Sequence, residues 1–263
     1  MRLEHANLFH LMLMLVMCAT IVVTIITAKR GRKLFIRRIP GLSAIDETVG
    51  RATEMGRPML FSVGLGSIDP LTLQAVGVMS YVARLAARYG NRLLVPVADA
   101  LMVAVCEEAT REAWQAEGKP EAYRPEDVRF LSDQQFAFAA GMMGLMMREQ
   151  VASTFLFGYF AAESLLLAEA GQEAGAIQVA GTPTTTQIPF FIVACDYTII
   201  GDEYYAASAY LTQEPTLLGS LVGQDISKAI LLTMIIVGTI LAVFPSDLWK
   251  HGVSPLIRVL GGE

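Results

Sequence analysis

Glu163 is a side chain that could do chemistry, because it lies in the apolar stretch YFAAESLLLAE. An apolar environment raises the pKa of a carboxyl group toward the range in which a general acid or base works. A carboxylate at a helix N-terminus is the structural alternative, since it stabilises the helix dipole without any catalysis. The sequence therefore makes Glu163 a catalytic candidate, and a purely structural role at the start of a helix is the alternative.

Two further segments, GLGSIDP and GTPTTTQ, have the composition of anion-binding turns. The first has two glycines in G-x-G spacing but lacks the third glycine of a dinucleotide-binding fingerprint. The second places hydroxyl groups before a predicted helix, whose N-terminal N–H groups attract anions. Helix capping and turn formation explain the same residues without a ligand. The residues predicted to bind a small anionic ligand are Gly64, Gly66, Ser67, Asp99, Gly181, Thr182, Thr184 and Thr185.

The central part of the chain lacks the side chains of many common reactions. The histidines are His5, His10 and His251, all in terminal segments, and Lys119 is the only lysine between residues 39 and 225. This composition argues against a histidine-activated nucleophile, a histidine-based zinc site and a P-loop lysine. The three cysteines have no C-x-x-C spacing, so neither a disulfide nor a zinc site is expected. We therefore expect no cofactor and no metal, and we favour a role other than catalysis.

Alternating β-rich and helical segments are expected to position these residues. Strands are predicted over residues 59–63, 92–97, 128–131, 153–157, 176–180 and 197–200. Helices are predicted over residues 70–89, 100–115, 133–148, 161–170, 184–195 and 203–211. This alternation predicts an α/β fold with a Rossmann-like, doubly wound, mainly parallel sheet. The candidate ligand residues would then lie beyond the carboxyl ends of the strands, where such sheets bind ligands.

The helix predicted over residues 133–148 contains FAFAAGMMGLMM, which is apolar almost all round. Ser132 and Gln135 have the spacing of a capping box at its start. Small residues four positions apart would allow a second helix to approach closely, whereas core packing is the alternative explanation. The residues of the predicted subunit interface are Ala137, Ala140, Gly141 and Gly144.

Two apolar segments flank the predicted α/β domain. Residues 8–28 are 21 in number and would form a helix about 31 Å long, enough to cross a hydrocarbon core of about 30 Å. Residues 229–244 number 16 and can form a short span if Lys228 snorkels. Trp249 follows as an interfacial anchor. The basic residues that flank the first segment are Lys29, Arg30, Arg32, Lys33, Arg37 and Arg38.

These basic residues predict the orientation of the chain, because cytoplasmic flanks of membrane spans are enriched in Lys and Arg. The central domain would face the cytoplasm, and both termini would lie outside. The predicted parts are a transmembrane anchor (1–28), a basic juxtamembrane connector (29–58), a cytoplasmic α/β domain (59–215), a second transmembrane segment with its lead-in (216–245) and an external tail (246–263).

The predicted cytoplasmic part is acidic. Residues 39–225 contain 22 Asp and Glu against 10 Lys and Arg, which gives a net charge of −12. Such a surface repels nucleic acid. The expected partners are the lipid bilayer, further copies of the same chain in a homo-oligomer, and a small anionic ligand.

Several segments resemble a family of prokaryotic two-span membrane proteins that is defined by a domain of unknown function. They are IPGLSAIDETVGRATEMGRP, FGYFAAESLLLAE, QVAGT, PFFIVACDYTIIGDE and LLGSLVGQD. The resemblance runs from about residue 39 through the second apolar segment. It implies two spans and a location in a prokaryotic cell membrane, and it implies no catalytic residues.

Taken together, these features favour a membrane-anchored, self-associating scaffold or partner-binding protein. The alternative is a membrane-tethered sensor that binds a nucleotide or another anionic ligand at the carboxyl ends of the strands.

Overall fold

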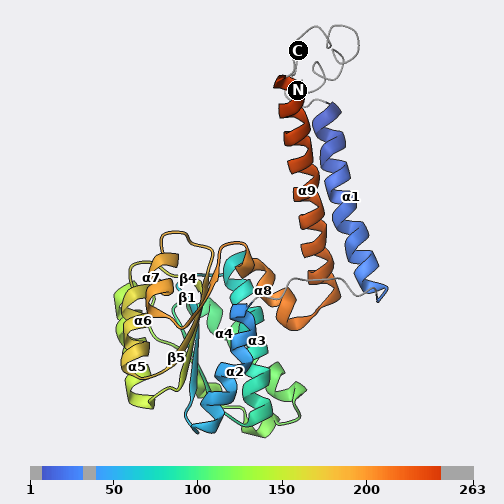
Figure 1. Ribbon diagram of the computed structural model, residues 1–263. Coiled ribbons are helices and arrows are strands. Elements are labelled where there is room, and N and C mark those ends of the chain that lie inside the picture. Colours follow the sequence, from blue (N-terminus) through green and yellow to red (C-terminus); the bar gives the residue numbers. More distant parts are fainter. Residues whose placement is uncertain (1–7, 32–39, 244–263) are drawn as a thin grey trace, which may run out of the picture. The chain divides into compact units, whose positions relative to one another are not determined.

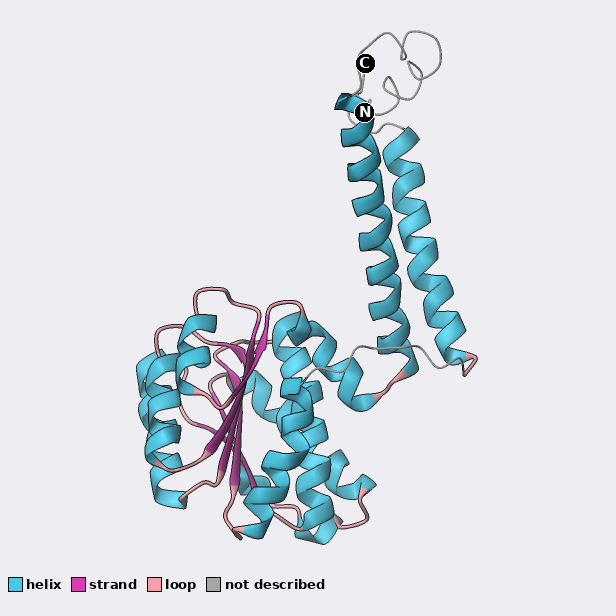
Figure 2. Ribbon diagram, in the orientation of Figure 1, coloured by secondary structure: helices cyan, strands magenta, loops and turns pink. Residues whose placement is uncertain are grey.

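The computed structural model describes residues 8–31 and 40–243, which belong to two compact units (Figures 1 and 2). One unit contains the two long apolar helices, α1 (Leu8–Lys29) and α9 (Pro215–Val243). The other is an α/β domain that spans residues 36–212.

The α/β domain is built on one parallel sheet of six strands, in the order β3-β2-β1-β4-β5-β6. The order reverses between β1 and β4, the kind of position at which open α/β sheets bind ligands. The prediction of an α/β protein with a parallel sheet is thereby confirmed. The strands are β1 (Met59–Gly64), β2 (Leu93–Val97), β3 (Val128–Phe130), β4 (Ser153–Tyr159), β5 (Ile177–Thr182) and β6 (Tyr197–Ile200).

Helices cover both faces of the sheet (Figure 2). One face carries α2 (Pro40–Glu54), α3 (Pro70–Tyr89), α4 (Ala100–Ala116) and α8 (Glu203–Thr212). The other face carries α5 (Gln135–Glu149), α6 (Ser164–Glu173) and α7 (Ile188–Ala194). Two short 3₁₀ turns, η1 (Pro120–Ala122) and η2 (Pro125–Asp127), lie between α4 and β3.

Aromatic rings form much of the core on the α3 face. The ring of Phe61 stacks against those of Phe155 and Phe157, with centroids 6.1 and 5.6 Å apart. Phe157 in turn stacks on Tyr204, whose hydroxyl donates to the Leu71 carbonyl oxygen at 2.8 Å. Because α8 supplies Tyr204 and α3 supplies Leu71, this cluster joins two helices to the centre of the sheet.

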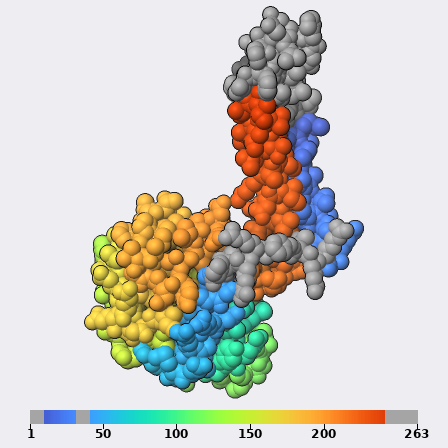
Figure 3. All heavy atoms as spheres, in the orientation of Figure 1, coloured from blue at the N-terminus to red at the C-terminus, as the bar shows by residue number. Residues whose placement is uncertain are grey.

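The segment before β1 belongs to the compact α/β unit, although its sequence suggests a connector. The α2 side chains Leu42, Ile45 and Val49 are fully buried. A methyl group on Gly41 would lie 2.9 Å from the Ile199 side chain of β6, so α2 packs closely on the edge of the sheet. In the space-filling view, the blue surface of α2 borders the orange surface of the last part of this unit (Figure 3).

Two helix starts differ from the sequence-based expectation. The Ser132 hydroxyl accepts from the Gln134 N–H, and the Gln135 side chain reaches Glu163 of another element, so the predicted capping box is wrong. The helix predicted from residue 184 begins at Ile188, because the preceding residues form a turn in which Gln187 N–H donates to the Thr184 carbonyl oxygen.

In the other unit, α1 and α9 pack side by side (Figure 1). Both are long and apolar enough to cross a membrane. Lys29 ends α1 and Arg30 follows it, and both are exposed. The other predicted flanking residues, Arg32, Lys33, Arg37, Arg38 and Trp249, and the predicted tail 246–263 lie outside the described residues.

Candidate functional site

The carboxyl ends of β1 and β4 are in direct backbone contact. Gly64 and Gly158 have φ angles of +80° and +125°. A methyl group on Gly64 would lie 2.1 Å from the Tyr159 carbonyl oxygen, and one on Gly158 equally close to that of Val63. Leu65 N–H also donates to Tyr159 O at 2.8 Å. These glycines are required for the approach of the two strands, which is a sufficient reason for Gly64 without a ligand.

The loop after β1 holds its own carboxylate at the start of α3. The Asp69 Oδ1 accepts from the Thr72 N–H at 2.7 Å. A methyl group on Gly66 would lie 2.0 Å from the Thr72 hydroxyl oxygen, so this glycine allows the loop to close on the helix. Ser67 is exposed on the same loop. Because Asp69 already occupies the helix N-terminus, a second anion there would be repelled.

Asp99 and Glu163 are the N-cap residues of α4 and α6, but only Asp99 caps its helix through the side chain. Asp99 Oδ1 accepts from the Leu101 N–H at 2.9 Å at the start of α4. Glu163 Oε1 accepts from the Ala161 N–H at 2.9 Å, and its Oε2 accepts from Gln135 Nε2 at 2.6 Å. Glu163 is 0% exposed, so no solvent or substrate reaches it in this structure. The geometry supports a structural role for this carboxylate.

The residues of GTPTTTQ are split between the core and the surface. Gly181 and Thr182 are buried, and Thr182 Oγ1 accepts from the Thr184 N–H at 3.2 Å. Thr184 is half-buried and Thr185 is exposed. Helix α7 has only 7 residues, so its N-terminus offers a weak dipole.

Each strand end, or the loop and first helical turn that follow it, has at least one exposed, large apolar side chain. Because all six strands are parallel, these side chains lie at the same edge of the sheet. Ile68 is 57% exposed and Leu101 is 64% exposed. We call this set the carboxyl rim: Phe130 of β3, Leu101 after β2, Ile68 after β1, Tyr159 of β4, Phe190 after β5 and Ile200 of β6.

The rim was not expected from the sequence, although a signal for it exists. Leu101 is the second residue of α4, Phe190 the third of α7, and Phe130 the last of β3. Polar residues are usual at such positions, where chains turn at the surface. Large apolar residues there are therefore the pattern that could have marked this edge.

Helix α5 has one buried side and one largely exposed side. Phe138, Met142 and Leu145 are buried against the sheet. Of the predicted interface residues, Ala137, Ala140 and Gly144 are exposed, and Gly141 is half-buried, where an added methyl group would meet Leu131 at 3.2 Å. Phe136, 60% exposed, precedes them at the start of the helix.

A family model described as a domain of unknown function, DUF6754, matches residues 2–252. The chain belongs to the DUF6754 family. No curated protein and no solved structure matches it.

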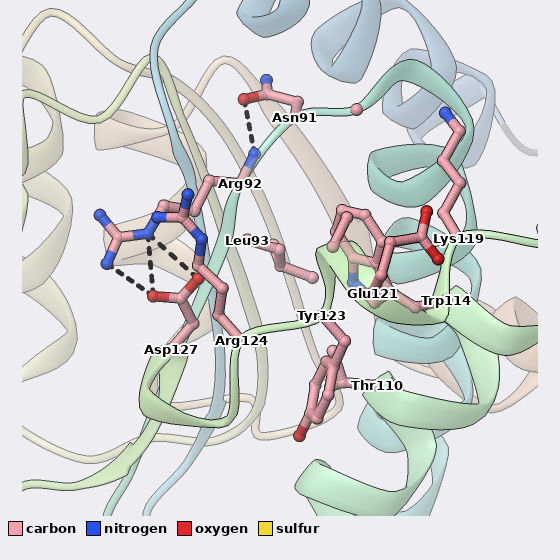
Figure 4. A pocket seen from close by; sticks show the side chains of 12 residues that line it. Asn91, Arg92, Leu93, Thr110, Trp114, Lys119, Glu121, Tyr123, Arg124 and Asp127 are labelled. Carbon is pink, nitrogen blue, oxygen red and sulfur yellow. Dashed lines mark hydrogen bonds and ion pairs between the residues drawn. The ribbon is translucent and has the colours of Figure 1, made fainter.

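This DUF6754 protein also has a cavity of about 280 Å³ at the opposite edge of the sheet (Figure 4). Arg92 lines it and is bound to Asp127 by hydrogen bonds of 2.6 to 3.0 Å, which together with Glu149 raise the pKa of the guanidinium. Lys119 Nζ donates to the carbonyl oxygens of Ala87 and Arg88, both at 2.8 Å. These cations are thus held by the protein itself.

Within the described parts of this DUF6754 chain, no three side chains of His, Cys, Asp or Glu are close enough together to hold a metal ion. Burial raises the pKa of the Cys106 thiol to about 12, and it does the same for Cys195, beside Asp196. Both thiols are therefore protonated near neutral pH and are poor nucleophiles.

Proposed function

We propose that this DUF6754 protein is a membrane-anchored, self-associating platform whose α/β domain binds a partner polypeptide at the carboxyl rim. In this proposal α1 and α9 both span a prokaryotic cell membrane, with the Rossmann-like domain in the cytoplasm and both termini outside. The basic residues Lys29 and Arg30 at the end of α1 support this orientation.

The carboxyl rim is the observation that carries the proposal. Isolated exposed apolar side chains are normal, but a set gathered at one edge is typical of an interaction surface. Apart from Ile68 in the loop before α3, these side chains lie at strand ends and helix starts, so a partner would meet them already arranged.

The charge at this edge indicates the chemistry of the partner. Asp69 and Asp99 hold carboxylates at the starts of two helices, and residues 39–225 have a net charge of −12. A basic, amphipathic segment would satisfy both features, since it offers apolar side chains to the rim and Lys or Arg to the acidic surroundings.

The same carboxylates count against the alternative of an anion sensor. Helix N-termini attract phosphate through their free N–H groups and positive dipole ends. Here the N–H groups of Thr72 and Leu101, at the starts of α3 and α4, already donate to carboxylates of the chain itself. A phosphate would have to displace those bonds and approach negative charge.

Site-specific photo-crosslinking in intact cells tests the proposed surface. A photoreactive residue at Leu101 or Ile68 should give a discrete adduct with another protein, whereas one at exposed Glu121, on the opposite edge, should not. Adding Phe190→Arg should reduce the yield of the adduct at position 101, because a cation at the rim repels a basic partner.

Three outcomes would contradict the proposal. The first is equal labelling from Leu101 and Glu121, and the second is no adduct from either rim position. The third is an adduct at twice the chain mass of 28.5 kDa, which would assign the rim to a second copy.

A further inference from the structure

The side of α5 that faces away from the sheet is apolar along most of the helix. Phe136, on that side, is 60% exposed. No residue from Phe136 to Met147 is charged. We call the following residues, which are exposed or half-buried, the α5 face: Phe136, Ala137, Ala140, Met143, Gly144 and Met147.

The α5 face is one continuous surface. Its members recur at spacings of three and four, so they lie on one side of the helix. From Phe136 to Met147 the helix rises about 17 Å. A helix that is apolar all round is normally buried, and a contiguous exposed apolar surface is typical of an interaction site. The α5 face is therefore a surface that a partner covers.

The charges at the two ends of the α5 face indicate which partner this is. Asp133 is exposed just before the helix begins, and Arg148 is exposed in its last turn. Within residues 8–31 and 40–243, neither side chain forms a hydrogen bond or an ion pair. A second copy of α5, running antiparallel to the first, would place each Asp133 opposite the other copy's Arg148. The surface is thus complementary in charge to itself.

We propose that two copies of the chain associate through antiparallel contact of their α5 faces. This inference rests on the self-association in the proposed function and names the surface that provides it. The twofold axis passes between Ala140 and Gly141, because positions 133 and 148 are equally far from that point. The same symmetry places Ala137 of each copy opposite Gly144 of the other, so the small residues lie where the two helices approach most closely.

The surroundings of the α5 face argue against a lipid surface as its cover. Helices that lie on a bilayer have Lys and Arg beside their apolar face, where anionic headgroups attract them. Arg148 is the only basic residue between positions 130 and 151. Helix α6, which packs beside α5 (Figure 1), exposes Glu169 and Glu173. Anionic lipid would repel these carboxylates.

The proposed contact is small, because each copy contributes one helix. We expect it to bury less surface than the roughly 1,200–2,000 Å² of a standard protein interface. Anchoring of both copies in one membrane would raise their effective concentration and offset this deficit. The pairing is therefore best tested on the full chain in native membranes.

Disulfide trapping tests both the surface and the direction of the helices. In a Cys18→Ser background, Ala140→Cys should give a linked dimer of twice 28.5 kDa, because position 140 lies beside the axis. Ala137→Cys on one tagged copy should link to Gly144→Cys on another. Two copies with Ala137→Cys should link at least fivefold more slowly, since their cysteines are about 10 Å further apart along the helices. Glu169→Cys, on exposed α6, is the matched control and should give no dimer.

Charge reversal tests the ends of the contact. Asp133→Arg or Arg148→Asp alone places like charges opposite each other and should reduce the dimer trapped through position 140 by about threefold or more. Both substitutions in one chain restore opposite charges between copies, so the yield should recover. The two positions are about 20 Å apart along α5, too far for an ion pair within one chain. Weakening of the helix ends alone would instead make the double variant the poorest.

Co-purification of two tagged copies without introduced cysteines separates the two levels of the proposal. Failure to co-purify, together with no trapped dimer, would refute the self-association in the proposed function. Co-purification without a dimer through position 140 would overturn the α5 pairing alone. Faster linking between two copies of Ala137→Cys than between positions 137 and 144, or no recovery in the double charge variant, would do the same.

Discussion

Gly64 and Tyr159 meet at the centre of the sheet, where a methyl group on Gly64 would lie 2.1 Å from the Tyr159 carbonyl oxygen. This contact joins the loops that follow β1 and β4. It therefore determines the spacing of the middle of the carboxyl rim, including Tyr159 itself.

Replacing Gly64 with alanine should destabilise the domain strongly. The substitution combines a φ of +80° with a backbone clash, and we expect a loss of about 3 kcal/mol or more in the free energy of unfolding. Gly90→Ala is the matched control, because Gly90 has a φ of +71° and nothing within 4 Å of an added methyl group. Gly90→Ala should lower the free energy of unfolding by only about 1–2 kcal/mol. Denaturant unfolding of both variants gives the comparison, and similar losses would contradict the close contact.

Gln135 and Glu163 should be energetically coupled, since half-buried Gln135 donates to buried Glu163 in a hydrogen bond of 2.6 Å. Glu163→Ala leaves the Gln135 amide and the Ala161 N–H without this acceptor, at a cost of about 2–3 kcal/mol. A double-mutant cycle with Gln135→Ala should show a coupling of about 1–2 kcal/mol. Additive effects of the two substitutions would show that the bond contributes nothing.

The α1–α9 pair should be sensitive to side-chain volume at Gly219. Cysteines at positions 20 and 227, in a Cys18→Ser background, should form a disulfide rapidly, because the native hydroxyls are 3.2 Å apart. Adding Gly219→Val should slow that reaction, since the new side chain would press on the Ile25 backbone. Gly238→Val should leave the rate unchanged, because a methyl group there meets nothing within 4 Å. Equal rates in all three proteins would refute the register.

The ionisation of Tyr81 should lower the stability of the domain at alkaline pH. Burial and then the 2.8 Å hydrogen bond that its hydroxyl donates to Asp46 raise the pKa of Tyr81 from 10.0 to about 12. The folded state thus favours the neutral phenol. Its contribution is fully present below pH 10, where the phenol is neutral in both states, and is lost as the pH rises toward 12.

Comparison with Tyr81→Phe isolates this contribution. The stability difference between the two proteins should be constant below pH 10 and shrink between pH 10 and 12. A difference spectrum should place the ionisation of Tyr81 near 12. An ionisation near 10 with no change in the stability difference would contradict the partial burial of Tyr81 and its bond to Asp46.

Local patterns in the sequence were enough to predict the order of strands and helices, because β-rich runs and helical periods depend on near neighbours. The bounds of α3 and β6 are those expected, and the parallel sheet followed from the alternation. The roles of the candidate site residues were harder to predict. Gly64 and Gly66 suggested a phosphate turn from composition, whereas each allows a close packing contact with a residue outside the motif.

The sequence by itself determined the element order, the two apolar segments, the acidic domain and the absence of a domain histidine, since these depend on residue type and local spacing. Only the tertiary structure decided that Gln135 bonds to Glu163, that six apolar side chains share one edge, and that Thr20 of α1 lies beside Ser227 of α9. Each of these is a relation between residues distant in the chain. Such relations are set by strand order and helix register, which arise from packing of the whole fold.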